Sequence, residues 1–306
     1  MTIHDAHCHF LTPRFFEALG LERHGRPAPA DQVARDLGWE APESTECLVE
    51  RWVKELDRNR VSRVALMASI PGDEESVSAA VRAFPERFVG FFVVNPLAPD
   101  AVSRARAVFA HPGMRCACLF AALHNYTLDS EPVERIFELA AEHHGGVFAH
   151  CGYLSIEARM RLGLPSVFDL HRGDPLALAR TAARFPNVPV IIPHFGAGFL
   201  REALMAAEAA PNIVLDTSSS NSWVRFLPGV TLADVFRQAL AVVGPDRLVF
   251  GTDSSHFPRG WRRVIVGAQR TILDELGVEV GVREQIFSRN FDRLFPVREQ
   301  GSGIRD

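Results

Sequence analysis

The chain has 306 residues, of which 47% are hydrophobic and 23% charged, and its formal net charge is −4. This composition suffices for a substantial core and indicates a single domain over residues 1–306, with about 297–306 as a flexible tail. The weak charge and scattered arginines argue against a nucleic-acid surface, and no apolar run is long enough to cross a bilayer. Because the N-terminus leads directly into the first predicted strand, no signal peptide is expected. We therefore expect a cytoplasmic protein whose partner is a small molecule; a homodimer remains open.

Eight apolar segments bounded by turn residues predict β-strands. In chain order they cover residues 3–10, 61–70, 88–95, 116–123, 146–151, 188–195, 212–219 and 247–254. The stretches between them, such as 130–144 and 174–185, have the spacing of amphipathic helices. Strands that are apolar on both faces and alternate with helices predict a parallel sheet, and eight such units predict an α/β fold of the (β/α)8 TIM-barrel type.

The first predicted strand contains the pattern D-x-H-x-H at residues 5–9. Because a strand alternates its faces with a period of two residues, His7 and His9 project to the same side. Two imidazoles one strand repeat apart can offer two ligands to one divalent metal ion. Two histidines can also form only a polar strand end, so the metal interpretation depends on the rest of the chain.

Three further candidate residues close apolar strands. His150, His194 and Asp253 end β-branched runs on the fifth, sixth and eighth predicted strands. The C-terminal ends of barrel strands form one face, which is where such folds carry their active sites. A lone histidine at a strand end can instead cap backbone groups, but here the candidates recur at equivalent barrel positions.

These motifs resemble the amidohydrolase superfamily, specifically its amidohydrolase-related branch, which contains aminocarboxymuconate-semialdehyde decarboxylase, other non-oxidative decarboxylases of aromatic acids, and lactone hydrolases. The resemblance spans nearly the whole chain and rests on DAHCH, FAHCG, PHFGAG, FGTDSSHFP and the closing RNFDRLF. It implies a metal-dependent enzyme in which the ligands are His7, His9, His150 and Asp253. It also implies that His194 stands beside the metal-bound water as a base or electrostatic partner.

The expected chemistry follows from the donor set. Three neutral imidazoles and one carboxylate suit Zn²⁺, with Mn²⁺ or Fe²⁺ as alternatives, and leave a position for water or substrate. Such an ion lowers the pKa of bound water to roughly 7. His194 then accepts the water proton and Asp253 passes a proton to the leaving group, so these two are the predicted catalytic residues.

One metal ion is expected for each chain. Superfamily members with two ions bridge them by a carbamylated lysine on the fourth strand or a carboxylate near it. The only lysine here, Lys54, lies in a predicted helix, and the fourth predicted strand has neither a lysine nor a carboxylate.

Long loops after the predicted strands are expected to shape a substrate pocket. Residues 152–173 and 219–230 follow the fifth and seventh strands, and residues 24–44 form either a mobile flap or an ordinary surface loop. An arginine in these loops can hold a substrate carboxylate, and a tryptophan can pack against a planar group, although a solvated surface arginine is the alternative. The candidate substrate contacts are Tyr153, Trp223, Arg225, His256, Arg259 and Trp261.

Three reactions are compatible with these features. We favour hydrolysis of a small-molecule lactone, ester or amide by metal-bound hydroxide, because the small Ser254 and Ser255, where many relatives carry an aromatic residue, leave room for a tetrahedral adduct. The main alternative is non-oxidative decarboxylation of an aromatic or unsaturated acid. A more remote one is a TatD-type metal-dependent nuclease, but its G-E-x-G-L-D segment and a basic groove are missing.

Overall fold

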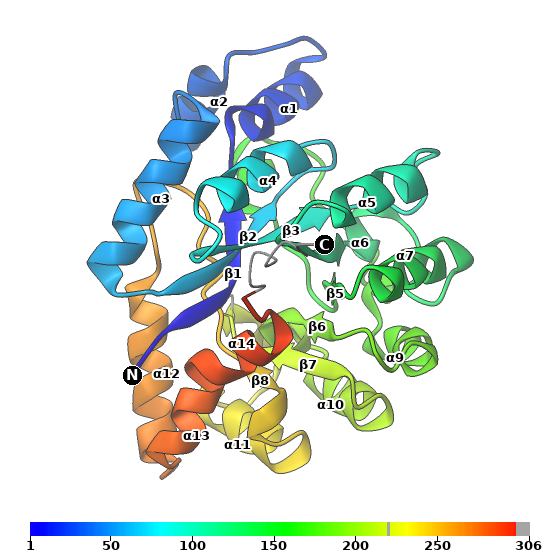
Figure 1. Cartoon of the computed structure of the whole chain (residues 1–306), viewed down its shortest axis with the longest axis vertical. Helices are drawn as coiled ribbons and strands as arrows, with labels where there is room; N and C mark the ends of the chain where they lie inside the picture. Colours follow the sequence, from blue (N-terminus) through cyan, green and yellow to red (C-terminus); the bar gives the residue numbers. More distant parts are fainter. Residues whose placement is uncertain (219–220, 298–306) are drawn as a thin grey trace, which may run out of the picture.

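The computed structural model describes residues 1–218 and 221–297, and eight parallel strands form its centre (Figure 1). They follow one another around the sheet in chain order, each paired with the next. The strands are β1 (His4–Phe10), β2 (Arg63–Ala68), β3 (Phe88–Val93), β4 (Met114–Leu119), β5 (Gly146–Ala149), β6 (Val190–Ile192), β7 (Ile213–Asp216) and β8 (Leu248–Val249). The predicted TIM barrel is therefore confirmed, whereas most of the predicted tail, residues 297–306, lies outside the described residues.

The barrel closes between β1 and the segment after β8. The backbone amide of Ala6 donates to the carbonyl of Phe250 at 2.9 Å, and that of His9 donates to Ser254 at 2.7 Å. The predicted eighth strand, 247–254, is thus shorter than expected as a regular strand, because its second half bends. Residue Asp253 adopts a φ of 58°, which a strand cannot accommodate.

Helices alternate with the strands and cover the outside of the barrel (Figure 1). The predicted helical stretches 130–144 and 174–185 correspond to α7 (Glu131–Glu142) and α9 (Pro175–Arg184), and each has a proline at its first turn, where the missing N–H costs nothing. The other α-helices are α1 (Pro13–His24), α2 (Ala30–Leu37), α3 (Thr45–Asn59), α4 (Glu74–Ala83), α5 (Ala101–Phe109), α6 (Ala121–His124), α8 (Glu157–Arg161), α10 (Leu200–Ala209), α11 (Leu232–Val242), α12 (Arg263–Glu275), α13 (Val280–Glu284) and α14 (Asn290–Leu294). Short 3-10 turns are η1 (Leu170–Gly173), η2 (Pro193–Gly196), η3 (Asn221–Phe226) and η4 (Pro245–Arg247), and η5 (Gln285–Arg289) is a π-helical turn.

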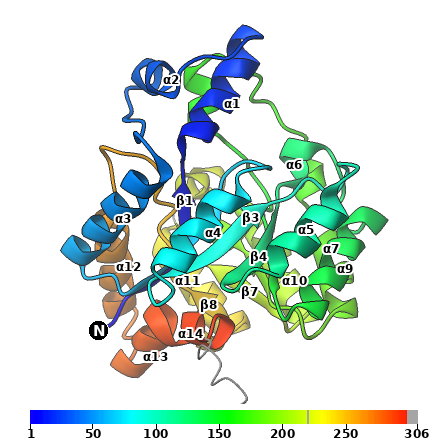
Figure 2. The same ribbon diagram turned by 45° about the horizontal axis from the view of Figure 1, so that its top comes forward.

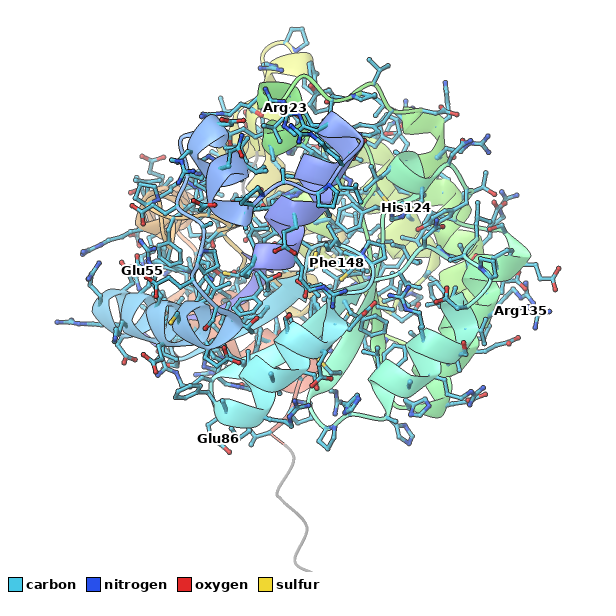
Figure 3. All side chains as sticks on the ribbon, turned by 90° about the horizontal axis from the view of Figure 1, so that it is seen from above. Arg23, Glu55, Glu86, His124, Arg135 and Phe148 are labelled. Atoms are coloured by element: carbon cyan, nitrogen blue, oxygen red, sulfur yellow. The ribbon has the colours of Figure 1, made fainter. Side chains whose placement is uncertain are left out.

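The strand side chains divide between two cores, as expected for strands buried on both faces. On β2, Val64 and Leu66 pack outward against the helices, whereas Ala65 and Met67 pack inside the barrel. Phe148 of β5, labelled near the middle of the molecule in Figure 3, belongs to the inner core. The barrel interior is therefore filled by side chains, and a site can form only at its end.

A third core joins α1, α2 and α8. It includes Phe16, Val33, Leu37 and Leu162, which come from two segments far apart in the sequence. Helices α1 and α2 lie beyond the carboxyl end of β1 (Figure 2). Residues 24–44, expected as a flap or loop, thus include the helix α2. None of the helices in the described ranges has both the length and the apolar character that a membrane span requires.

Candidate metal centre

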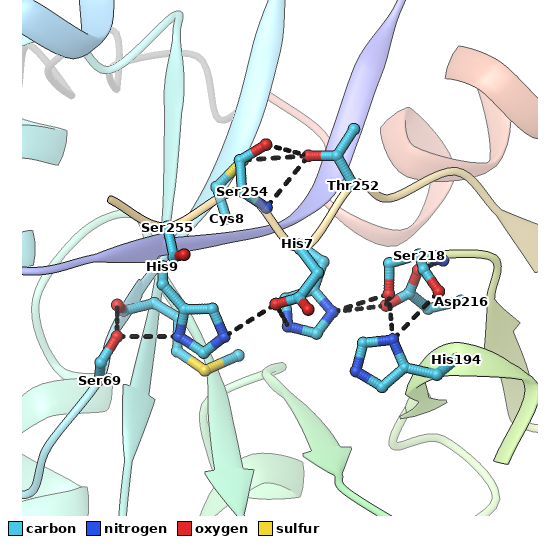
Figure 4. Close-up of polar contacts among 12 residues, drawn as sticks. His7, Cys8, His9, Ser69, His194, Asp216, Ser218, Thr252, Ser254 and Ser255 are labelled. Atoms are coloured by element: carbon cyan, nitrogen blue, oxygen red, sulfur yellow. Dashed lines mark hydrogen bonds and ion pairs between the residues drawn. The ribbon is translucent and has the colours of Figure 1, made fainter. Parts of the chain in front are cut away.

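Strand β1 directs His7 and His9 to the same side, as its alternation predicts. The ligand atoms of these two residues and of Asp253 all lie within 4.8 Å of one another. Nε2 of His9 lies 3.2 Å from Oδ1 of Asp253, and Nε2 of His7 lies 3.6 Å from the same oxygen. Figure 4 shows the rings of His7 and His9 on the same side of β1. Segments separated by more than 240 residues therefore place two imidazoles and a carboxylate around one point.

The acidic residue of the D-x-H-x-H pattern has a different role. The pairing of β1 with β2 shifts register between Asp5 and Cys8, so strict alternation does not extend to Asp5. Its carboxylate is fully buried, and it accepts hydrogen bonds from Oγ1 of Thr252 at 2.6 Å and from Nε1 of Trp261 at 2.7 Å. Burial raises the pKa of Asp5 to about 6, although these hydrogen bonds oppose the rise. Asp5 thus connects β1 to the segment after β8.

The partners of His7 determine which of its nitrogens faces the cluster. Nδ1 of His7 lies 2.8 Å from Oδ2 of Asp216, at the end of β7. Because a carboxylate can only accept, Nδ1 carries the proton, and Nε2 presents its lone pair on the side of Asp253. This carboxylate–histidine pairing is typical of metal-binding histidines.

His9 is held in the same way by Ser69, just beyond β2. Nδ1 of His9 lies 2.9 Å from Oγ of Ser69, and that hydroxyl donates its own proton to the carbonyl of Met67 at 3.1 Å. The hydroxyl oxygen is therefore the acceptor for His9, whose Nδ1 carries the proton. The lone pair of Nε2 faces Asp253 here too.

His194 follows β6 and lies beside this cluster. Its ring centroid is 5.0 Å from that of His7, and its Nδ1 lies 3.0 Å from the backbone carbonyl oxygen of Ser218. A carbonyl accepts only, so Nδ1 of His194 also carries the proton and Nε2 carries the lone pair. Burial lowers the pKa of His194, so its imidazole is neutral at pH 7.

His150 is near the cluster but not within the group of three. Its ring centroid lies 5.5 Å from that of His194, and its Nδ1 is buried without a hydrogen-bond partner among the described residues. Burial holds the pKa of His150 well below its usual value, so it is a neutral donor. An unpartnered buried nitrogen beside two imidazoles and a carboxylate fits the donor set that a divalent metal requires.

The cluster favours an ionised carboxylate. Burial by itself would raise the pKa of Asp253, but the neighbouring side chains of His9, His7 and His194 outweigh it, and the pKa is lowered below its ordinary value. Asp253 is therefore in the charged form that can bind a metal ion.

A cavity of about 980 Å³ opens above the cluster. Three of the candidate substrate contacts, Tyr153, Arg225 and Arg259, line it. Arg225 and Arg259 make no ion pair within residues 1–218 and 221–297, whereas Arg159, which also borders the cavity, is paired with Glu22 at 2.6 Å. Among the described residues, the cavity thus offers two arginines that form no salt bridge, although the carboxylates of Asp253 and Glu157 lie close enough to act on Arg259.

The other three expected substrate contacts lie outside the cavity, which corrects the sequence-based expectation. Trp261 is 4% exposed because its indole N–H is bound to Asp5 beneath the site. Trp223 is 1% exposed and packs in the outer core. His256 stacks on the ring of Trp39 and borders a separate small hollow.

Several supporting residues were missed by the sequence analysis. Asp216 closes the apolar run of β7 in the same manner as Asp253 closes that of β8, so a signal for it was present. Ser69 and Ser218 carry no comparable signal, because serine is common beyond strand ends. Trp39, which borders the cavity, lies in the segment interpreted as a flap or loop.

The sequence model of a protein family described as amidohydrolase matches residues 4–297. The chain belongs to the amidohydrolase family. No curated protein matches its sequence significantly. The expected family is therefore confirmed over nearly the whole chain.

Three solved structures illustrate the shared fold. The 5-carboxyvanillate decarboxylase of Novosphingobium aromaticivorans, in complex with manganese, is 15% identical, with a TM-score of 0.63 and coverage of 96% of each chain. A probable 2-pyrone-4,6-dicarboxylic acid hydrolase of Acinetobacter baumannii, with citric acid bound, is 14% identical, with a TM-score of 0.61 and coverage of 96% of this chain and 99% of that one. An amidohydrolase of Burkholderia multivorans with bound zinc is 13% identical, with a TM-score of 0.64 and coverage of 97% and 100%.

These neighbours include both of the enzyme classes expected from the sequence, hydrolases and decarboxylases. They also hold divalent metal ions, manganese in one case and zinc in another. Family membership thus identifies the chain as one of a group of metal-dependent enzymes, and the cluster of His7, His9 and Asp253 is where its described residues can hold a metal ion.

Proposed function

We propose that this protein is a metal-dependent hydrolase that opens a lactone, ester or amide bond in a small molecule bearing a carboxylate. The observation that carries the proposal is the common orientation of His7, His9 and His194. Each has its Nδ1 against an oxygen that accepts, which leaves each Nε2 as a base or ligand. Two of them face Asp253, and the third lies beside them.

In this proposal His7, His9, His150 and Asp253 hold one divalent ion. Three imidazoles and a carboxylate suit Zn²⁺ best, with Mn²⁺ or Fe²⁺ as alternatives. When bound, an ion of this kind lowers the pKa of water and polarises a carbonyl group. The hydrogen bonds to Asp216 and Ser69 keep the two β1 histidines in the orientation that this donor set needs.

His194 acts as the general base. Its Nδ1 proton is bound to Ser218, so Nε2 is the nitrogen that can take a proton from an attacking water. The same histidine can return that proton to the leaving group. Burial keeps the imidazole neutral at pH 7, which is the state that a base requires.

Arg225 and Arg259 select an acidic substrate. Both line the cavity, and neither makes an ion pair within the described ranges of the chain. A guanidinium binds a carboxylate with two parallel hydrogen bonds, so these side chains suit a carboxylate that does not itself react. The bound citric acid of the Acinetobacter neighbour supports an acidic ligand for such a cavity.

Decarboxylation is the second candidate, supported by the name of the manganese-containing neighbour. That reaction requires an acid to protonate the carbon from which CO₂ leaves. His194 and Asp253 serve either reaction, so these two residues do not separate the candidates. We favour hydrolysis because the small Ser255 lines the cavity and leaves room for a tetrahedral adduct.

The test compares two substrate panels on the Zn²⁺-loaded protein. One panel contains carboxylated lactones and amides, and the other hydroxybenzoates and muconate-like acids, with acid release and CO₂ release followed separately. We expect acid release from the first panel, lost in His194→Ala and retained in the control His171→Ala, an exposed histidine outside the cavity. Release of CO₂ without turnover of any lactone or amide would establish the decarboxylase instead.

A further inference from the structure

Trp39 reaches the cavity wall from a segment that the barrel itself does not require. It directly follows α2 and its glycine cap, and it is 9% exposed. The next residue, Glu40, donates its backbone N–H to the carbonyl of Phe257 at 2.9 Å and forms an antiparallel bridge with it. Trp39 is therefore fixed against the loop after β8, which also carries Asp253.

The indole of Trp39 stacks on the imidazole of His256. The ring centroids are 3.9 Å apart, and the two planes differ by 5°. His256 thus covers one face of the indole, while Trp39 itself borders the large cavity. A flat side chain backed by a second flat ring presents a rigid surface, since neither ring can rotate without breaking the stack.

A cationic group lies next to this stack. Arg259 donates to Oγ of Ser255 at 2.6 Å, and the same hydroxyl lies 3.3 Å from Nδ1 of His256. Ser255 and Arg259 both line the cavity with Trp39. Because the side chain of Ser255 is small, the wall at this point consists of an aromatic surface beside a guanidinium.

We propose that Trp39 is a specificity-determining residue whose indole contacts a planar ring of the substrate, while Arg259 holds a carboxylate on that ring. His256 is a positioning residue that keeps the indole in place. The inference rests on the proposed function for the identity of the reacting site, and it adds that the acidic substrate is planar. A pair of stacked aromatic rings is stabilised by more than the burial of its surface. This extra stabilisation corresponds to roughly a threefold to tenfold tighter binding of a planar ring than of a saturated one.

The experiment measures binding by calorimetry on the Zn²⁺-loaded protein. The probes are isophthalate and its saturated counterpart, cis-cyclohexane-1,3-dicarboxylate, which match in charge and differ in planarity. We expect isophthalate to bind at least about fivefold tighter. Trp39→Leu should reduce this ratio to within about twofold without loss of zinc, and Trp39→Phe should retain most of it. Trp223→Phe, a buried tryptophan outside the cavity, is the matched control and should leave the ratio unchanged.

Two substitutions of His256 test whether it positions the indole of Trp39. His256→Ala should lower the ratio toward that of Trp39→Leu, whereas His256→Phe, which restores a flat ring behind the indole, should recover it. A purely structural role would instead lower the affinity for both probes equally in both variants.

Three results would overturn the inference: equal affinities in the unaltered protein, an unchanged ratio in Trp39→Leu, or no measurable binding of isophthalate. The readout is binding, so it is separate from the hydrolase proposal. A protein that hydrolyses carboxylated lactones but binds both probes equally contradicts only the role of Trp39. One that prefers isophthalate but turns over no lactone, ester or amide contradicts only the hydrolase.

Discussion

Hydrogen bonds that point away from the site determine what its histidines can do. Asp216 accepts from His7, Ser69 accepts from His9, and Ser218 accepts from His194. In each neutral imidazole the partner determines the tautomer, with the proton on Nδ1 and the lone pair on Nε2. The difference between a ligand and a base then depends on position, since only the first two nitrogens face Asp253 closely.

Ligand and base can be separated by two substitutions. His150→Ala should weaken zinc binding sharply, because it removes a neutral buried donor. His194→Ala should keep the zinc and lose about 10²- to 10⁴-fold in rate, which is the usual contribution of a general base. Elemental analysis of the zinc content and an assay of turnover, both made on the same samples, check the two predictions. Equal loss of zinc from the two variants would mean that His194 is a ligand.

His124 provides a pH-dependent prediction at the rim of the site. It lines the cavity at the end of α6, and burial lowers its pKa from 6.5 to about 4. Between these values the unfolded chain binds a proton that the folded chain does not, so stability due to His124 is lost as the pH falls from about 6.5 to 4. His124→Gln should therefore lose less unfolding free energy over this interval than the unaltered protein.

Urea unfolding in EDTA at pH 7 and pH 4.5 measures this difference. EDTA removes the contribution of bound metal from both proteins. His24→Gln, at an exposed histidine, is the matched control. Parallel loss of stability in His124→Gln and the unaltered protein would show that His124 is not buried as neutral imidazole.

At the scale of elements, the site depends on irregular backbone just beyond β6 and β8. His194, Phe195, Ala197 and Asp253 all have positive φ angles, from 44° to 58°. Such conformations cost about 1–3 kcal/mol each for residues with a side chain, and the surrounding packing must maintain them. They turn the chain out of the strand direction and so aim His194 and Asp253 at the end of the barrel.

Gly251, just after β8, lies close to Asp216 of β7 and to His7 of β1. A Cβ at this position would lie 2.5 Å from Oδ1 of Asp216 and 3.0 Å from Cβ of His7. Gly251→Ala should therefore lower the free energy of unfolding by about 1–3 kcal/mol. Because it displaces the carboxylate that orients His7, it should also weaken zinc affinity by about 10- to 100-fold.

Gly267→Ala is the matched control for this substitution. Gly267 lies within α12 and is exposed, and a Cβ there would meet nothing within 4 Å. This variant should gain about 0.5–1 kcal/mol through better helix propensity and keep its zinc affinity. Denaturant unfolding and zinc titration compare the two. Similar behaviour of both alanines would contradict the close approach at Gly251.

For the whole molecule, the site is one end of a closed barrel whose interior is already filled. β4 faces inward with Cys116 and Cys118, which are buried and apolar in their surroundings, and Lys54 is exposed on α3 beside Glu50. Lys54, the only lysine of the chain, therefore lies on an outer helix and cannot bridge two metal ions at the end of the barrel. One cluster, that of His7, His9 and Asp253, is present in the described ranges.

We accordingly expect one tightly bound zinc ion for each chain. Zinc at 100 times its Kd should add about 2.7 kcal/mol to the unfolding free energy, because the unfolded chain lacks the assembled site. Elemental analysis after reconstitution and thermal unfolding with and without EDTA measure the two quantities. Two tightly bound ions, or no change in Tm on chelation, would contradict a single assembled site.

The sequence by itself determined the barrel and the residues at its strand ends. Periods of two and 3.6 residues are local properties, so eight alternating units were predictable without knowing how they meet. His150, His194 and Asp253 were recognisable because each closes an apolar run. The bend in β8 was not, because it depends on the left-handed conformation of Asp253 within a packed structure.

Only the tertiary structure decided what surrounds these residues. Trp261 and Trp39 both looked like loop residues, yet one is bound to Asp5 beneath the site and the other borders the cavity against His256. These partners lie more than 200 residues apart in the chain. Local periodicity sets which side of an element a residue occupies, but the packing of distant segments sets which side chain it meets there.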